Sequence, residues 1–323
     1  MNRVRLAVVG AGAFGRNHLR ILAASPDAEL VAAADSEAAA AQQAAEQFNC
    51  RAINDYRQLA GLCDAAVIAT PTSSHEEIAA FLMDAGIDVL IEKPITPSVA
   101  AAVRLSGQAA ATGRILQVGH LERFNPAVRA LEKRVTLPLF FEVHRLSLFS
   151  PRSLDVDVVL DLMIHDLEII LALTRSEPEE VRASGISILS KKVDIANVRL
   201  AFPGGVIANL TASRVSTERV RKLRLFQPNQ YISIDYGKQE LLAVGVTPER
   251  QVQFLPAQVV KDEPLRLELE HFLECVRTRR APLVGAPEAT RALRVAESIL
   301  AKIEEHAQVV AQTIATSSLA RPS

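Results

Sequence analysis

The most constraining feature of the sequence is a glycine-rich turn between an apolar run and a helical stretch. Residues 5–10 have the composition of a buried strand, and residues 14–24 have the apolar spacing of a helix. The junction reads GAGAFG, a GxGxxG pattern. In this context the glycines permit a tight turn, and the helix N-terminus offers free N–H groups to a pyrophosphate. The pattern predicts dinucleotide binding by Gly10, Gly12, Ala13, Phe14 and Gly15.

Short β-rich runs and helical stretches alternate over residues 1–119. The runs are 5–10, 29–35, 65–70, 88–93 and 114–119, and the helical stretches are 14–24, 36–48, 75–85 and 97–112. Nearly continuous apolar strands separated by helices are typical of a doubly wound parallel sheet. We therefore expect an α/β Rossmann domain over residues 1–119.

From residue 120 onward the pattern changes. One helical stretch, one strand-like run and one very apolar helix precede a series of strand-like runs that extends from residue 181 to about 260. These segments lie at 126–134, 137–147 and 156–173, and amphipathic helices follow at 264–279 and 287–306. The order predicts an α+β domain over residues 120–323, built on a mostly antiparallel sheet with helices on one face. The terminal helices could pack back on the first domain.

Asp35 closes the second β-rich run and favours NAD over NADP as the cofactor. A carboxylate at this position accepts hydrogen bonds from the adenosine ribose and repels a 2′-phosphate. An aspartate that only caps the next helix is the alternative. In open α/β sheets, ligands lie beyond the carboxyl ends of the strands. We therefore expect further cofactor contacts from Ser36, Thr70, Pro71, Thr72 and His75.

Composition excludes several other classes of protein. The formal net charge of −1 over 323 residues indicates neither a nucleic-acid-binding protein nor one attracted to acidic membranes. The three cysteines lack the spacing of a zinc site, and their odd number argues against a disulfide framework. We expect no metal, no targeting peptide and no transmembrane helix, and a cytoplasmic location with free thiols.

Three further motifs carry a family resemblance. Glu92-Lys93-Pro94 ends the fifth run, GHLERFNP spans residues 119–126, and DLMIHDLEIIL spans residues 161–171. With the glycine turn, and in this order, they closely resemble the glucose–fructose oxidoreductase / inositol dehydrogenase / MocA (Gfo/Idh/MocA) family. The resemblance covers nearly the whole chain. It implies an oxidoreductase that transfers a hydride between a sugar-like secondary alcohol and NAD.

Lys93, Asp161 and His165 are the candidate catalytic residues. A lysine at the carboxyl edge of the sheet can bind a substrate hydroxyl and stabilise alkoxide character. Asp157, Asp161 and His165 recur at i, i+4 and i+8, which would give one polar stripe on a buried helix. A structural aspartate–histidine pair is the alternative reading. The resemblance implies that His165 is the general base and Asp161 its partner, although Lys93 and His165 could exchange roles. Glu92 joins Lys93 as a candidate cofactor contact.

The predicted substrate follows from the resemblance of two segments to one branch of the family. Two segments, SLFSPRSLDVDVVLDLMIHDLEIIL and ERVRKLRLFQPNQYISIDY, resemble a bacterial branch near the lipid A pathway. That branch oxidises the 3-hydroxyl of UDP-N-acetylglucosamine to a 3-keto sugar. A nucleotide sugar needs cationic donors for its diphosphate. Candidates for substrate binding are Arg123, Asn125 and Arg152, beside Lys93, Asp161 and His165, and Arg145 and Arg214 lie in nearby segments.

Two other functions remain open from the sequence. A dehydrogenase of free polyols or sugars, such as inositol, is one alternative. Many relatives have a glycine pair before the Asp/His helix, whereas this chain has RSLDVDVVLD, and this departure argues against a substrate carried over from the inositol or glucose branches. A non-catalytic NAD-binding regulatory protein is the other, because a fold does not guarantee chemistry. We also expect a homodimer or homotetramer through the open face of the second sheet.

Overall fold

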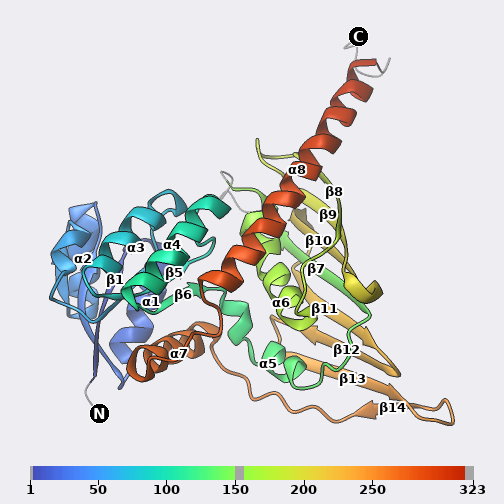
Figure 1. Ribbon diagram of the computed structural model, residues 1–323, viewed down its shortest axis with the longest axis horizontal. Helices are drawn as coiled ribbons and strands as arrows, with labels where there is room; N and C mark the ends of the chain where they lie inside the picture. Colours follow the sequence, from blue (N-terminus) through green and yellow to red (C-terminus); the bar gives the residue numbers. More distant parts are fainter. Residues whose placement is uncertain (1–2, 150–155, 317–323) are drawn as a thin grey trace. The chain divides into compact units, whose positions relative to one another are not determined.

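The computed structural model describes residues 3–149 and 156–316, and its contacts divide the chain into two units (Figure 1). The first unit comprises Met1–Phe124 and Asp262–Thr290. The second comprises Asn125–Lys261 and Arg291–Ser323. The chain passes from the first unit to the second between Phe124 and Asn125, whereas the sequence placed the domain boundary at residue 119. Residues 262–290 belong to the first unit again.

The first unit contains a six-stranded parallel sheet in the order β3-β2-β1-β4-β5-β6. Its strands are β1 (Val4–Val9), β2 (Ala28–Ala34), β3 (Arg51–Ile53), β4 (Ala65–Ile68), β5 (Asp88–Glu92) and β6 (Leu116–Gly119). The predicted doubly wound Rossmann sheet is confirmed. The sequence missed β3, because a three-residue strand with two exposed members shows no apolar run.

Helices of the first unit form two groups. Helix α1 contacts both α2 and α7, whereas α3 contacts α4. Their bounds are α1 (Ala13–Ala24), α2 (Ala38–Phe48), α3 (His75–Asp84), α4 (Val99–Thr112) and α7 (Pro264–Thr278), with short 3₁₀ turns η1 (Tyr56–Leu59), η2 (Thr72–Ser74) and η3 (Leu121–Phe124). Leu269 and Phe272 of α7 join Leu6 and Leu19 in one buried cluster, so α7 is part of this unit's core.

The second unit is built on an eight-stranded sheet in the order β14-β13-β12-β11-β7-β10-β9-β8. The β7–β10 pair is parallel and the other pairs are antiparallel, which confirms the expected mostly antiparallel sheet. The strands are β7 (Phe140–Leu148), β8 (Glu180–Ile186), β9 (Ile195–Ala201), β10 (Ile207–Ser216), β11 (Val220–Gln227), β12 (Gln230–Asp235), β13 (Glu240–Val246) and β14 (Val252–Leu255).

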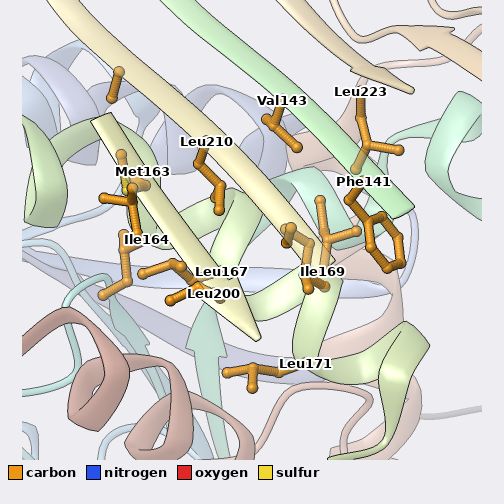
Figure 2. Packing of buried hydrophobic residues seen from close by; sticks show 14 of the residues in the cluster. Phe141, Val143, Met163, Ile164, Leu167, Ile169, Leu171, Leu200, Leu210 and Leu223 are labelled. Carbon is orange, nitrogen blue, oxygen red and sulfur yellow. The ribbon is translucent and has the colours of Figure 1, made fainter. Parts of the chain in front are cut away.

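Helices cover one face of this sheet and bury its core. They are α5 (Pro126–Glu132), the π-helical turn η4 (Val159–Met163), α6 (Ile164–Thr174) and the long α8 (Ala286–Thr316), whose first five residues belong to the first unit. Figure 2 shows Ile164 and Leu167 of α6 beside Leu200 of β9. Within the described ranges, no helix combines the length and hydropathy that a membrane crossing needs.

Candidate active site

The glycine turn between β1 and α1 has no room for larger residues at two of its three glycines. Gly10 has a φ of +97°, and a Cβ there would lie 2.5 Å from the Ala69 carbonyl oxygen. A Cβ on Gly15 would lie 1.8 Å from the Gly10 carbonyl oxygen, so Gly15 lets α1 pack on the turn. A Cβ on Gly12, in contrast, would meet nothing within 4 Å. The turn is therefore closely packed at Gly10 and Gly15 and open at Gly12, as binding of a pyrophosphate requires.

Asp35 braces this turn from the end of β2. Its carboxylate accepts hydrogen bonds from the Ala11 N–H at 2.7 Å and from the Glu37 N–H at 2.9 Å. The side chain is thus fixed at the mouth of the turn rather than free to rotate away. A carboxylate held in this way can accept hydrogen bonds from the hydroxyls of a ribose.

A cavity of about 590 Å³ opens beside the turn, within the size range of ligand sites. Six of the predicted cofactor contacts line it, namely Gly10, Gly12, Asp35, Ser36, Thr70 and Pro71. Ala13, Phe14, Gly15, Thr72, His75, Glu92 and Lys93 are outside this lining. The open approach at Gly12 and the fixed carboxylate fit a dinucleotide with its adenosine half in this cavity.

Several lining residues were missed from the sequence. Asn54, Asp55, Tyr56 and Arg57 follow β3, and they line the cavity together with Glu77. Arg57 lies over the Tyr56 ring at 4.6 Å and donates to Glu77 at 2.8 Å. The only sequence signal was the turn composition around Asn54-Asp55, because the strand before it is so short.

His75 ties the ends of β4 and β5 together. Its Nδ1 lies 3.0 Å from the Pro94 carbonyl oxygen and its Nε2 lies 2.9 Å from the Thr70 carbonyl oxygen. Burial lowers the pKa of His75, so the neutral ring donates to one of these two carbonyls at neutral pH. The imidazole therefore joins the backbone of Thr70, which lines the cavity, to that of Pro94, and its assignment as a direct cofactor contact stays a prediction.

The predicted reactive strand end is built around Lys93. Glu92, which precedes it, is buried and accepts a hydrogen bond from His18 Nε2 at 2.7 Å. Lys93 itself is half-buried and precedes a cis peptide bond to Pro94. Burial, and then the positive charges of Lys93 and Arg123, lower the pKa of His120 to about 3. His120 is therefore a neutral neighbour of Lys93 at working pH.

In the second unit, Asp161 and His165 occupy the junction of η4 and α6. The N–H of Ile164 donates to the Val159 carbonyl, which makes this turn π-helical, a feature that often marks functional sites. His165 is 8% exposed and Asp161 is half-buried. Helix α6 is buried on nearly all sides, as its all-round apolar sequence predicts.

Asp157 does not belong to the predicted polar stripe. It precedes the helix, and its carboxylate accepts a hydrogen bond from the Val193 N–H at 2.9 Å. The next residue, Val158, donates its own N–H to the Val193 carbonyl. The chain is thus held to the loop before β9 here, which delays the helix start that the sequence placed at residue 156.

Two arginines that were considered as ligands of a diphosphate form contacts within the second unit. Arg145 forms a buried bidentate pair with Asp166, at 2.6 and 2.9 Å, and lies over the Tyr236 ring. Arg214 is also buried, and donates to the Val156 carbonyl. These contacts account for both residues as structural, so their expected role as diphosphate ligands gains no support.

The remaining substrate candidates are placed as follows. Asn125 caps α5 by accepting from the Ala127 N–H, and it donates to the Tyr236 carbonyl. Arg123 is buried in η3, within the first unit. Arg152 lies outside the described residues. All three assignments to the substrate stay predictions, as do the catalytic roles of Lys93, Asp161 and His165.

Two family models match the chain. An oxidoreductase family model with an NAD-binding Rossmann fold matches residues 4–120, and a GFO/IDH/MocA C-terminal domain model matches residues 144–229. Together they cover parts of both structural units. The first match supports a nicotinamide dinucleotide as the cofactor.

Several proteins are similar to the chain over most of its length. The UDP-N-acetylglucosamine 3-dehydrogenase of Acidithiobacillus ferrooxidans is 35% identical over 314 residues, covering 95% of this chain and 100% of the relative. Its solved structure superposes with a TM-score of 0.89, covering 95% of this chain and 99% of that one. The scyllo-inositol 2-dehydrogenase (NAD(+)) of Bacillus subtilis is 28% identical, covering 91% of this chain and 92% of the relative.

More distant structures share the fold. The myo-inositol 2-dehydrogenase of Lactobacillus plantarum is 19% identical with a TM-score of 0.80, covering 94% of this chain and 98% of that one. The matched models, the glycine turn and the full-length similarity lead to one assignment. The chain belongs to the GFO/IDH/MocA family of oxidoreductases and is a sugar dehydrogenase of that family.

Proposed function

We propose that this enzyme oxidises the 3-hydroxyl of UDP-N-acetylglucosamine to the 3-keto sugar, a precursor for lipid A-type synthesis. The observation that carries the proposal is the 35% identity, over the full length of the relative, to a UDP-N-acetylglucosamine 3-dehydrogenase. The resemblance of the segment around Asp161 and His165 to the sequences of that branch also supports it. The proposed location is the cytoplasm, where the free thiols Cys50, Cys63 and Cys275 stay reduced.

We further propose NAD as the preferred cofactor. Asp35 is fixed by two backbone N–H groups beside the cavity, so its charge cannot turn away from a 2′-phosphate. Arg57 is the one arginine or lysine among the described residues that line the cavity, and it is paired with Glu77 and Asp55. Both features favour a free 2′-hydroxyl.

The proposed chemistry divides among three side chains. Bound nicotinamide supplies the acceptor for the hydride that leaves the carbinol carbon. His165 takes the hydroxyl proton, and Asp161 orients the imidazole or the substrate. Lys93 donates a hydrogen bond to the same oxygen and stabilises its alkoxide character. Lys93 and His165 are both able to accept the proton, and the exchange of their roles stays open within this proposal.

The test is NADH formation by the purified protein, followed by absorbance. NAD and NADP are each combined with UDP-N-acetylglucosamine, free N-acetylglucosamine, myo-inositol and scyllo-inositol. We expect turnover with the UDP sugar and NAD, and a loss of roughly 100-fold or more in kcat for His165→Ala and for Lys93→Ala. His306→Ala, a histidine on α8 outside the proposed machinery, serves as the matched control and keeps wild-type activity.

A second candidate function has its own support. The similarity to scyllo-inositol 2-dehydrogenase covers 91% of the chain, so a free polyol is the alternative substrate. Turnover with an inositol and none with the UDP sugar would move the enzyme to that branch. Absence of turnover with any of the four alcohols would overturn both assignments.

A further inference from the structure

A buried polar cluster lies at the end of β5, where Lys93 follows the strand, and it belongs entirely to the first unit. It consists of His18 from α1, Glu92 from β5, Gly119 from β6 and Glu268 from α7; we call it the Glu92 cluster. Side chains His18 and Glu268 are fully buried, and Glu92 is 8% exposed. Nothing in the proposed chemistry uses His18 or Glu268. Burying three ionisable groups together is costly, so the cluster needs an explanation.

The His18–Glu92 bond joins helix α1 to the end of β5. His18 Nε2 lies 2.7 Å from Glu92 Oε1, while the buried Nδ1 has no hydrogen-bond partner among the described residues. A histidine with its proton on Nε2 satisfies this bond and leaves no donor unpaired at Nδ1. The bond therefore joins α1, the helix that begins at the pyrophosphate cradle, to the residue next to Lys93.

The Glu92 carboxylate lies against Gly119 of the neighbouring strand. Gly119 is the partner of Glu92 in the β5–β6 register. A Cβ on Gly119 would lie 2.8 Å from Glu92 Oε2 and 2.9 Å from Glu92 Cδ. The carboxylate thus fills the space that a side chain on Gly119 would occupy, and only glycine leaves Glu92 where His18 reaches it.

Glu268 is the second buried carboxyl group of the cluster. Neither of its carboxyl oxygens has a hydrogen-bond partner among the described residues, whereas its backbone carbonyl accepts from Gln117 Nε2 at 3.2 Å. Burial, and then the negative charge of Glu92, raise the pKa of Glu268 well above its ordinary range. Glu268 therefore keeps its proton to a higher pH than an exposed glutamate does.

We propose that His18 is a positioning residue for the dehydrogenation: its bond to Glu92, in the space left by Gly119, fixes the Lys93 strand end to the helix of the pyrophosphate cradle. The inference rests on the proposed function, since it concerns Lys93, the residue proposed to stabilise the alkoxide. We expect the bond to affect the geometry of the chemical step more than the affinity for NAD, because His18 and Glu92 lie outside the lining of the cavity assigned to the adenosine half.

The experiment compares His18→Gln with His18→Leu in the full-length protein. Glutamine places an amide N–H near the position of Nε2, whereas leucine fills the volume without a donor. We expect His18→Leu to lower kcat roughly tenfold or more, a change of about 1.4 kcal/mol in the barrier, with the NAD dissociation constant within about twofold of wild type. His18→Gln should restore most of the lost kcat.

Gly119→Ala provides an independent test of the same bond. Its new methyl group overlaps the Glu92 carboxylate, so we expect a similar loss of kcat. Gly107→Ala on α4 is the matched control, because a Cβ at Gly107 meets nothing within 4 Å, and it should leave kcat unchanged. Gly119→Ala decides the question if His18→Leu does not fold.

Hydrogen exchange separates this inference from the proposed function. Exchange of the peptide covering residues 88–96 needs no substrate, and we expect it to be faster in His18→Leu and Gly119→Ala than in wild type, His18→Gln or Gly107→Ala. Wild-type inactivity on every alcohol would overturn the proposed function while the exchange result still tests the bond. The inference is overturned if folded His18→Leu keeps wild-type kcat and exchange, or if His18→Gln loses as much as His18→Leu.

Discussion

Glu268 offers a test of how burial sets protonation in this protein. Its pKa is raised by burial and by the Glu92 carboxylate, so the folded chain holds a proton that the unfolded chain releases above the ordinary pKa of 4.5. Where the folded state binds more protons, stability falls as pH rises. Glu268→Gln removes this dependence, so the stability of the variant relative to wild type should increase with pH, by up to about 1.4 kcal/mol per pH unit.

The measurement is urea unfolding of both proteins at pH 5 and pH 8. Glu270→Gln, an exposed glutamate on the same helix, is the matched control and should show no such increase. An offset between Glu268→Gln and wild type that is equal at both pH values would mean that Glu268 is ionised in the folded protein.

At the residue scale, the sequence was informative where a motif is local. Gly10, Gly12 and Asp35 lie within one strand–helix–strand unit, and all three line one cavity, while their contact with the cofactor stays a prediction. His18 and Glu268 were not found, because each looks like an ordinary helix residue until the fold brings it to Glu92. His18 and Glu92 are separated by 74 positions, and no spacing rule connects them. Asp157 was wrongly placed inside the helix, because its side chain accepts from the Val193 N–H and the N–H of the next residue, Val158, donates to the Val193 carbonyl.

Helix α4 shows how a single cap sets an element boundary. Ser98 is its N-cap, and the side chain accepts a hydrogen bond from the Ala101 N–H at 3.3 Å. Ser98→Ala leaves that N–H without its cap, and we expect a loss of about 1 kcal/mol in the free energy of unfolding with unchanged kcat. Ser106→Ala, inside the same helix, is the comparison and should change stability by less than about 0.5 kcal/mol. Equal unfolding midpoints for the two variants would contradict a capping role for Ser98.

At the element scale, the strongly apolar strands and the helix termini marked by glycine were predictable. Gly113 ends α4 with a left-handed φ of +64°, as its position in the sequence indicates. The start of α4 was misplaced, since Pro97 precedes the cap instead of opening the helix. Strands β13 and β14 were not resolved individually, because their outward residues are as apolar as their inward ones and the period-2 signal is lost.

The open face of the eight-stranded sheet carries a continuous apolar row. Directly paired residues run across five neighbouring strands of the second unit: Phe140, Phe226, Tyr231, Val244 and Phe254. The residues next to them, Phe141, Leu225, Ile232 and Ala243, are buried in the core under the helices. Because side chains alternate between the faces of a strand, the row belongs to the face without helices. Phe226 is 39% exposed and Phe254 is 75% exposed, so this row is open to solvent in the isolated chain.

An apolar row of this length on an exposed sheet is the feature expected of a subunit contact, and we predict a homodimer or homotetramer that buries it. Light scattering of the purified protein should give at least twice the mass of one chain. Phe226→Glu combined with Phe254→Lys places charges in the row and should shift the protein to the monomer, because an unpaired charge buried in an interface is strongly unfavourable. Val103→Glu, an exposed valine on α4 in the first unit, is the matched control and should leave the mass unchanged. A wild-type monomer would show that the row stays exposed in solution, and an oligomer that survives the double substitution would place the contact on another surface.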